Sequence, residues 1–264
     1  MNKKTLVIIA AVVILAAVGA IVFTQFPRKG SESGRGMGQE NGGQEIGQST
    51  AKPEAKLVAL GSSLSRASNL STKMQGENPE QSFSTGTEID SVYTFLKSKE
   101  GNLTATNLAA PGANMEDILD RQLSRALSLN PKYITIDPAA DIVSKNSIPQ
   151  YRKDLNQILD RINPKTTIMI FTYPNFTKMR TANYSSCQEN KVGVKLGNLS
   201  EKNILSFNQT IKEITKNRSN VILIDTYSLL GQGDVSDYDC LHVNLGAQKK
   251  IASEFIKMLS SEGR

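Results

Sequence analysis

The chain has 264 residues, of which 39% are hydrophobic, 21% are charged and 6% are aromatic, with two cysteines and one histidine. These values exclude collagen-like, coiled-coil and disulfide-scaffold proteins. The formal net charge of +6 does not indicate a nucleic-acid partner, because residues 57–264 hold 24 basic against 21 acidic residues and the basic ones are scattered. A surface that follows phosphates needs clustered lysine and arginine, so we predict no binding of nucleic acid.

The N-terminal segment 1–23 is predicted to enter a membrane. Lys3 and Lys4 precede the uncharged run 5–23, and a helix of that length matches the hydrocarbon thickness of a bilayer. The lysines place the N-terminus inside and the following domain outside the cytoplasm. The run exceeds the usual apolar region of a cleaved signal peptide, which favours a single-pass anchor in the cell membrane. Cleavage near Val18-Gly19-Ala20 is the alternative and predicts a secreted protein.

Residues 24–55 differ in composition from everything that follows. They are rich in Gly, Ser, Gln and charged residues, hold seven of the 19 glycines and have no apolar periodicity. Such a segment buries too little apolar surface to offset its ordering entropy. We predict a flexible linker that joins the membrane segment to one globular domain, residues 56–264, which is long enough to form its own core.

Within residues 56–264, short apolar runs alternate with amphipathic stretches. The runs are rich in Val, Ile, Thr or Tyr and predict five strands. A helix is predicted from the N-cap residue Asn114, with Glu116 and Asp117 in its first turn, and further helical stripes cover 151–162, 204–214 and 251–259. We therefore predict an α/β fold: a three-layer sandwich around a central, mostly parallel five-stranded sheet. The strands are expected at 57–60, 104–108, 133–136, 167–173 and 221–225.

Ligands bind such sheets at the carboxyl ends of the strands, and four loops that carry polar residues follow strands there. The first is Gly-Ser-Ser-Leu-Ser at 61–65, and the last contains His242, the only histidine. Histidine is the usual base for a serine hydroxyl at neutral pH, and Asp239 can accept from its ring and fix the tautomer. An isolated Asp-x-x-His is more often a surface or helix-capping pattern. Its place on the same rim as a serine cluster favours a Ser-His pair.

Three of these loops resemble the sequence blocks of the GDSL/SGNH hydrolases. Residues 61–65 are similar to the first block, Gly-Asp-Ser-Leu, whose serine is the nucleophile. Residues 107–112 resemble the second block, whose glycine lends a backbone N–H to the oxyanion hole. Residues 239–242, Asp-Cys-Leu-His, resemble the last block with the catalytic Asp and His. The similarity extends from Lys56 to about Ser260 and implies the flavodoxin-like SGNH fold.

The chain departs from that family pattern at two positions. Ser62 stands where the family has Asp, a residue that mostly shapes the loop. The third block normally reads Gly-x-Asn-Asp, and its Asn donates to the oxyanion, whereas residues 138–141 read Pro-Ala-Ala-Asp and place Ala140 at that position. Losing one oxyanion donor costs on the order of a hundredfold to a thousandfold in turnover. Weakened activity is therefore expected, with the backbone N–H groups of Ser63 and Gly112 and the side chain of Asn114 as remaining candidate donors.

The resemblance implies acyl transfer on a carboxylic ester through Ser63, His242 and Asp239. It implies no cofactor, and we see no cluster with the spacing of metal ligands. The expected protein is thus a membrane-tethered, extracytoplasmic serine esterase or lipase-like hydrolase acting on a small-molecule, lipid or glycan ester. Two alternatives stay open. One is an O-acyltransferase or deacetylase of a cell-envelope glycan, and the other, favoured by Ala140, is a non-enzymatic binding module on the same fold.

The two cysteines of an exported domain suggest a disulfide between Cys187 and Cys240. Such a bridge would hold the polar segment 174–198 beside the Asp-x-x-His turn as a flap over the substrate. Two free thiols that never meet are an equally open interpretation, because pairing depends on geometry.

Overall fold

The computed structural model describes residues 54–144, 147–180 and 199–263. Its centre is a five-stranded sheet in the order β2-β1-β3-β4-β5, in which every neighbouring pair is parallel. The predicted α/β fold and its five strands are confirmed, although three strands end one or two residues earlier than expected. The strands are β1 (Lys56–Leu60), β2 (Thr104–Asn107), β3 (Tyr133–Ile136), β4 (Thr167–Phe171) and β5 (Val221–Ile224).

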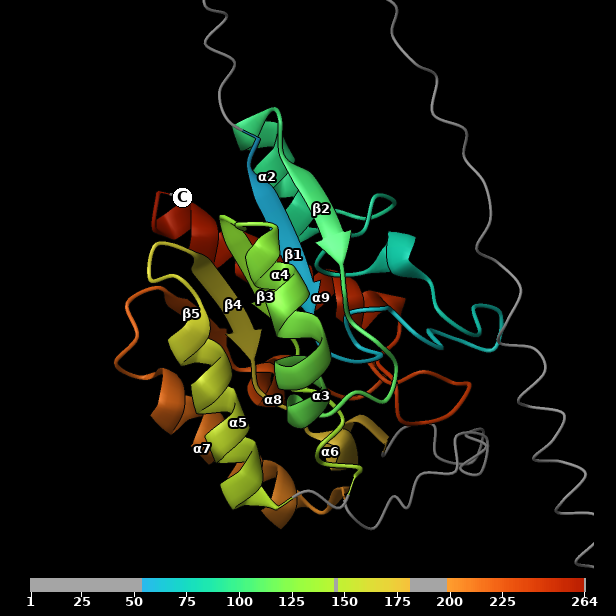
Figure 1. The fold of residues 1–264 in the computed structure, drawn as a ribbon. Helices are drawn as coiled ribbons and strands as arrows, with labels where there is room; N and C mark the ends of the chain where they lie inside the picture. The colour runs from blue at the N-terminus through green and yellow to red at the C-terminus, as the bar shows by residue number, and fades with distance from the viewer. Residues whose placement is uncertain (1–53, 145–146, 181–198, 264) are drawn as a thin grey trace, which may run out of the picture. The chain divides into compact units, whose positions relative to one another are not determined.

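Helices cover both faces of the sheet and give the three layers that the sequence predicts. One apolar core lies between the sheet and a set of helices that includes α5 (Ile148–Arg161) and α7 (Glu201–Thr215). A second core on the opposite face contains side chains of α2 (Val92–Glu100) and α9 (Leu245–Ser261). In Figure 1 the helix α5 lies in front of the sheet and α9 lies behind it.

The helix predicted after the second strand is interrupted. Asn114 is its N-cap as expected, and its side chain accepts from the backbone N–H of Asp117. The following turns are α3 (Met115–Asp117), the π-helical η2 (Ile118–Gln122) and α4 (Leu123–Ser128). A π turn inside a helix changes the direction in which later side chains point, and such turns occur often at functional sites. Here the last residue of the π turn, Gln122, is buried.

The remaining short helices lie in loops that follow strands. They are η1 (Pro79–Gln81), α6 (Phe176–Arg180) after β4, and α8 (Thr226–Leu229) after β5. Because the strands are parallel and Leu60 is in register with Ile136, the loop after β1 meets the loop after β3 at one edge. This is the carboxyl edge, where the predicted site residues converge.

Within the described ranges, no helix is long and apolar enough to cross a membrane. The predicted membrane segment 1–23 and the linker up to residue 53 lie outside these ranges, so both stay predictions. Residue 187, in the proposed flap, also lies outside them.

Candidate active site

Ser63 lies in the turn that follows β1. The conformation of this turn requires a glycine at position 61. Gly61 has a φ of +133°, and a Cβ atom at this position would lie 2.3 Å from the carboxyl group of Asp137. Any larger residue would push the turn away from the sheet. The turn continues past Ser63 with a hydrogen bond from the backbone N–H of Ser68 to the carbonyl of Ser63.

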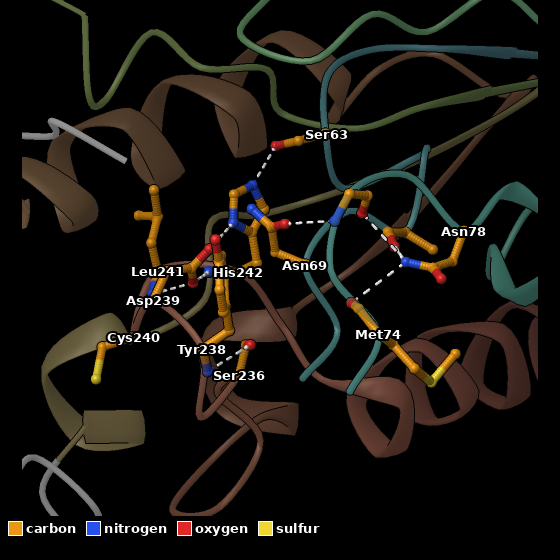
Figure 2. A network of polar contacts seen from close by, with 12 residues as sticks. Ser63, Asn69, Met74, Asn78, Ser236, Tyr238, Asp239, Cys240, Leu241 and His242 are labelled. Carbon is orange, nitrogen blue, oxygen red and sulfur yellow. Dashed lines mark hydrogen bonds and ion pairs between the residues drawn. The ribbon is translucent and has the colours of Figure 1, made fainter. Parts of the chain in front are cut away.

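His242 is brought to Ser63 by the Asp-x-x-His turn between β5 and α9. Its Nε2 lies 2.8 Å from Oγ of Ser63, and its Nδ1 lies 2.6 Å from Oδ2 of Asp239. The other carboxylate oxygen of Asp239 accepts from the backbone N–H groups of Leu241 and His242, both at 3.0 Å. Figure 2 shows Ser63, the imidazole ring and Asp239 in one hydrogen-bonded chain. Residues 63 and 242, which are far apart in sequence, are therefore neighbours, as predicted.

The electrostatics of this chain favour an ionised aspartate. Asp239 has no solvent exposure. Burial disfavours its charged form, but the side-chain hydrogen bond and coulombic interaction with His242 and the backbone N–H groups of His242 and Leu241 together outweigh burial and hold the pKa of Asp239 below its usual value. A carboxylate at this position accepts from Nδ1–H and leaves the Nε2 lone pair facing the Ser63 hydroxyl.

The residue between Asp239 and Leu241 is held in an unusual conformation. Cys240 has a φ of +56°, in the left-handed region that residues with a Cβ seldom adopt. It is fully buried and disulfide-bonded, and its carbonyl accepts from Nε of Arg180 at 2.8 Å. Cys187, its predicted partner, lies outside the described residues. The turn that carries Asp239 and His242 is thus fixed from the α6 side as well as by its own hydrogen bonds.

A small apolar pocket opens beside Ser63 and His242. Its volume is about 50 Å³. Apolar side chains from the loops after β1, β3, β4 and β5 form most of its wall, so a substrate group bound here would be apolar and short. The lining residues other than Ser63 and His242 are Ser62, Leu64, Ala139, Ala140, Ile142, Val143, Phe176 and Leu241.

A profile of the GDSL-like lipase/acylhydrolase family matches residues 57–255. The chain belongs to this family. The search of curated proteins found no match. Among solved structures, the lipase/acylhydrolase from Enterococcus faecalis is 16% identical, with a TM-score of 0.55 over 79% of this chain and 96% of that one. The psychrotrophic esterase EstA from Pseudoalteromonas sp. is 13% identical, with a TM-score of 0.50 over 78% and 97%.

An acetyl xylan esterase, AlAXEase, shares 13% identity, with a TM-score of 0.51 over 77% of this chain and 99% of that chain. At these identities the structural likeness shows the shared fold. The chain is thus a GDSL-family α/β protein, and the roles of its site residues follow from their geometry in this structure.

The predicted oxyanion donors do not all lie at the Ser63 pocket, in contrast to the Ser-His-Asp chain. The backbone N–H groups of Ser63 and Gly112 donate to no acceptor within the part of the chain that the structure describes, so both are free to donate to a ligand. Gly112, with a φ of +79°, lines a different hollow from Ser63. Asn114 accepts at its side-chain oxygen as the N-cap of α3, and it is not among the residues that line the Ser63 pocket.

Ala140 lines the Ser63 pocket and brings no side-chain donor to it. The backbone around it does not replace that donor. The N–H of Ala139 donates to Oδ1 of Asp137 at 2.8 Å, and the N–H of Ala140 donates to the carbonyl of Ala113 at 2.8 Å. The loop after β3 therefore offers the reacting centre neither an Asn side chain nor a backbone N–H from these two residues.

Sequence reasoning missed the side chains that hold the nucleophile turn. Gln122 accepts from the N–H of Gly61 and donates to its carbonyl, both at 2.9 Å, and Gln248 donates to the carbonyl of Leu64 at 3.0 Å. Both glutamines lie in helical sequence, where a Gln looks like a solvated residue. The sequence could have indicated Asp137 as a candidate site residue, because it directly follows a buried strand.

Within the described ranges, no group of three or more His, Cys, Asp or Glu residues could hold a metal ion.

Proposed function

We propose that this protein is a serine esterase in which Ser63 is the nucleophile, His242 the general base and acid, and Asp239 the residue that orients the imidazole. The observation that carries the proposal is the continuous chain from Ser63 Oγ through His242 to Asp239, at 2.8 Å and 2.6 Å. Family membership supports acyl ester chemistry.

In the first half of the reaction, Oγ of Ser63 forms a bond to the ester carbonyl carbon while its proton passes to Nε2 of His242. The buried carboxylate of Asp239 stabilises the resulting imidazolium. The carbonyl oxygen, now an oxyanion, accepts from the free backbone N–H of Ser63. The tetrahedral intermediate collapses, the ester C–O bond breaks, and His242 returns the proton to the departing alkoxide.

In the second half, water attacks the acyl group on Ser63. His242 takes a proton from that water, and the acyl–Oγ bond then breaks. The proton returns to Oγ, the carboxylic acid leaves, and the chain of hydrogen bonds is restored.

The pocket beside Ser63 supports esters of short acyl chains. A volume of about 50 Å³ with an apolar wall accommodates a small apolar group. The name of one fold relative, acetyl xylan esterase, supports including carbohydrate-bound acetyl groups among the esters tested. Transfer to a glycan acceptor would use the same acyl-enzyme, with a sugar hydroxyl in place of water.

A non-enzymatic or strongly weakened protein is the second candidate, and Ala140 is the observation that favours it. The lost donor reduces support for the oxyanion but leaves proton transfer between Ser63 and His242 intact. Turnover that depends on Ser63, even when slow, supports the esterase, and no turnover favours a binding role.

Hydrolysis of p-nitrophenyl acetate by the purified domain tests the proposal. We expect turnover that Ser63→Ala abolishes and that falls as the acyl chain is lengthened. Ser68→Ala is the matched control, because Ser68 is a buried serine of the same turn whose hydroxyl has no hydrogen-bond partner among the described residues. No difference between the wild-type protein and Ser63→Ala would contradict the esterase and favour a binding role.

The proposal also places the domain outside the cytoplasm, tethered by residues 5–23. The uncharged run behind two lysines supports this, as does the disulfide at Cys240. We expect the full chain in the membrane fraction, with its domain degraded by protease added to the outside of intact cells. A full chain in the soluble cytoplasmic fraction would contradict it.

A further inference from the structure

The carboxylate of Asp137 is the hydrogen-bond acceptor beneath the nucleophile turn. Its Oδ2 accepts from the backbone N–H groups of Ser62 at 2.7 Å and Ser65 at 2.9 Å. Its Oδ1 accepts from Oγ of Ser62 at 3.1 Å and from the backbone N–H of Ala139 at 2.8 Å. Ser63 lies between two of these donors in the chain, so the carboxylate holds the backbone on both sides of the nucleophile.

This carboxylate has no solvent contact and no counter-ion. Its exposure is 0%, and no ion pair joins it to any residue that the structure describes. Burial raises the pKa of Asp137, whereas the backbone N–H groups of Ser62, Ser65 and Ala139 oppose this rise. Both oxygens face N–H donors, and only the ionised group accepts from all of them. A buried charge held in this way ties its donors firmly in place.

The ends of the turn are held by other groups. Gln122 is bonded to both the N–H and the carbonyl of Gly61, and Gln248 holds the carbonyl of Leu64. Asp137 instead takes up the N–H groups on either side of Ser63. Removing it leaves the turn attached to the sheet but loses the two backbone N–H contacts that flank Ser63, whose Oγ lies opposite Nε2 of His242.

We propose that Asp137 is a positioning residue for Ser63: its carboxylate fixes the backbone at Ser62 and Ser65 so that the nucleophile lies within hydrogen-bond distance of His242. The inference rests on the proposed esterase and goes beyond it by assigning a role to a residue outside the Ser-His-Asp chain. It also explains why position 61 is glycine, since a Cβ there would collide with this carboxylate.

Asp137→Asn is the sharpest variant. Each oxygen of Asp137 accepts from a backbone N–H. Whichever way the amide is placed, its NH₂ group therefore faces a backbone donor and breaks at least one of these bonds. Asp154→Asn is the matched control. Asp154 is also buried, at 2% exposure, but its hydrogen bonds come from the side chain of Gln150 in α5, which an amide oxygen can still accept.

The experiment measures kcat and KM on p-nitrophenyl acetate together with amide hydrogen exchange at Ser62 and Ser65. For Asp137→Asn we expect kcat to fall about tenfold to a hundredfold with little change in KM, because misplacing a reacting group by about 1 Å has effects of that size. The two amides should exchange faster than in the wild type, while Asp154→Asn changes neither kcat nor these amides.

Ser62→Ala covers the case in which Asp137→Asn does not fold. It removes the hydroxyl donor and keeps the backbone N–H, so we expect a smaller fall in kcat, about twofold to tenfold. A kcat for both variants equal to that of Asp154→Asn, with unchanged exchange at Ser62 and Ser65, would overturn the inference and leave the esterase standing. Wild-type turnover that Ser63→Ala does not reduce would overturn the esterase, and the amide exchange would still measure whether Asp137 holds the turn.

Discussion

The two sides of the proposed reacting centre differ in how completely their hydrogen-bonding groups are arranged. On the proton-transfer side, Ser63, His242 and Asp239 form a closed chain, and the aspartate is buried and bonded to the backbone of its own turn. On the oxyanion side, Ala140 supplies no side-chain donor, the backbone N–H of Ser63 is free within the described residues, and Gly112 lines a different hollow from Ser63.

This difference separates two contributions that are usually present together. Proton transfer depends on the placement of a few side chains, whereas stabilisation of the oxyanion depends on preorganised donors around one oxygen atom. A site with intact proton transfer and fewer oxyanion donors is expected to form the acyl-enzyme slowly, still through Ser63 and His242. Removing a group on the proton-transfer side should therefore lower activity, whereas adding a donor on the oxyanion side should raise it.

The largest effect is expected on the proton-transfer side. Asp239→Asn keeps the size of the side chain but presents an amide to Nδ1, which favours the wrong imidazole tautomer, and we expect kcat to fall about 10⁴-fold. Ester hydrolysis with burst-phase analysis measures this. Asp237→Asn is the control, because that carboxylate bonds Thr72 in the neighbouring loop. Equal kcat values for the two variants would show that Asp239 does not orient His242.

Adding a donor on the oxyanion side should raise kcat. Ala140→Asn places an amide donor on the wall of the Ser63 pocket, and we expect kcat to rise about tenfold to a hundredfold, somewhat less than the cost of deleting such a donor from an optimised site. The rise should be in kcat, since the donor acts on the transition state. Ala140→Leu adds similar bulk without a donor and should give no gain. A rise in both variants, or in neither, would mean that the missing amide is not what limits turnover.

A variant at Gly112 tests whether its backbone N–H supports the oxyanion, with a smaller expected change in kcat. Gly112→Ala strains a backbone with a φ of +79° in open space and should lower the free energy of unfolding by about 1–2 kcal/mol. Gly76→Ala, at a φ of +75° and equally open, should cost a similar stability in the loop after β1. We expect only Gly112→Ala to lower kcat, by several-fold. Chemical denaturation and ester hydrolysis of both variants distinguish strain from catalysis, and equal kcat values would remove Gly112 from the oxyanion hole.

The smallest effect concerns stability against pH. The pKa of Asp239 is lowered in the folded protein, so its ionised form stabilises the fold at neutral pH, and this contribution is lost as the pH falls through the folded pKa. The difference in free energy of unfolding between the wild type and Asp239→Asn should therefore be largest near pH 7 and shrink below about pH 4. Urea unfolding at both pH values measures it. A difference that grows on acidification would mean that the carboxyl is held neutral.

The sequence was sufficient for the sheet because each strand is a short apolar run bounded by turn residues. It was also sufficient to bring Ser63 and His242 together, since parallel strands deliver their loops to one edge. The π turn at η2 was not predictable, because its apolar spacing matches that of an ordinary helix. That turn ends at Gln122, whose contact with Gly61 depends on packing between segments 61 residues apart.

The position of Asp137 directly after a buried strand was visible in the sequence, but its contacts with the turn after β1 were not. Its four donors come from its own loop and from the turn after β1, which only the register of β1 with β3 brings together. Cys240 is disulfide-bonded, and its pairing with Cys187 stays a prediction because residue 187 lies outside the described ranges.

Peptide mapping after labelling with an organophosphonate tests the central claim most directly. The phosphonate reacts with a serine that a neighbouring base activates, so it reports the Ser63–His242 pair through a single covalent step that does not require turnover. The account predicts an adduct on Ser63 in the wild type and none after His242→Ala. An adduct on another serine, or labelling of Ser63 that survives the loss of His242, would contradict it.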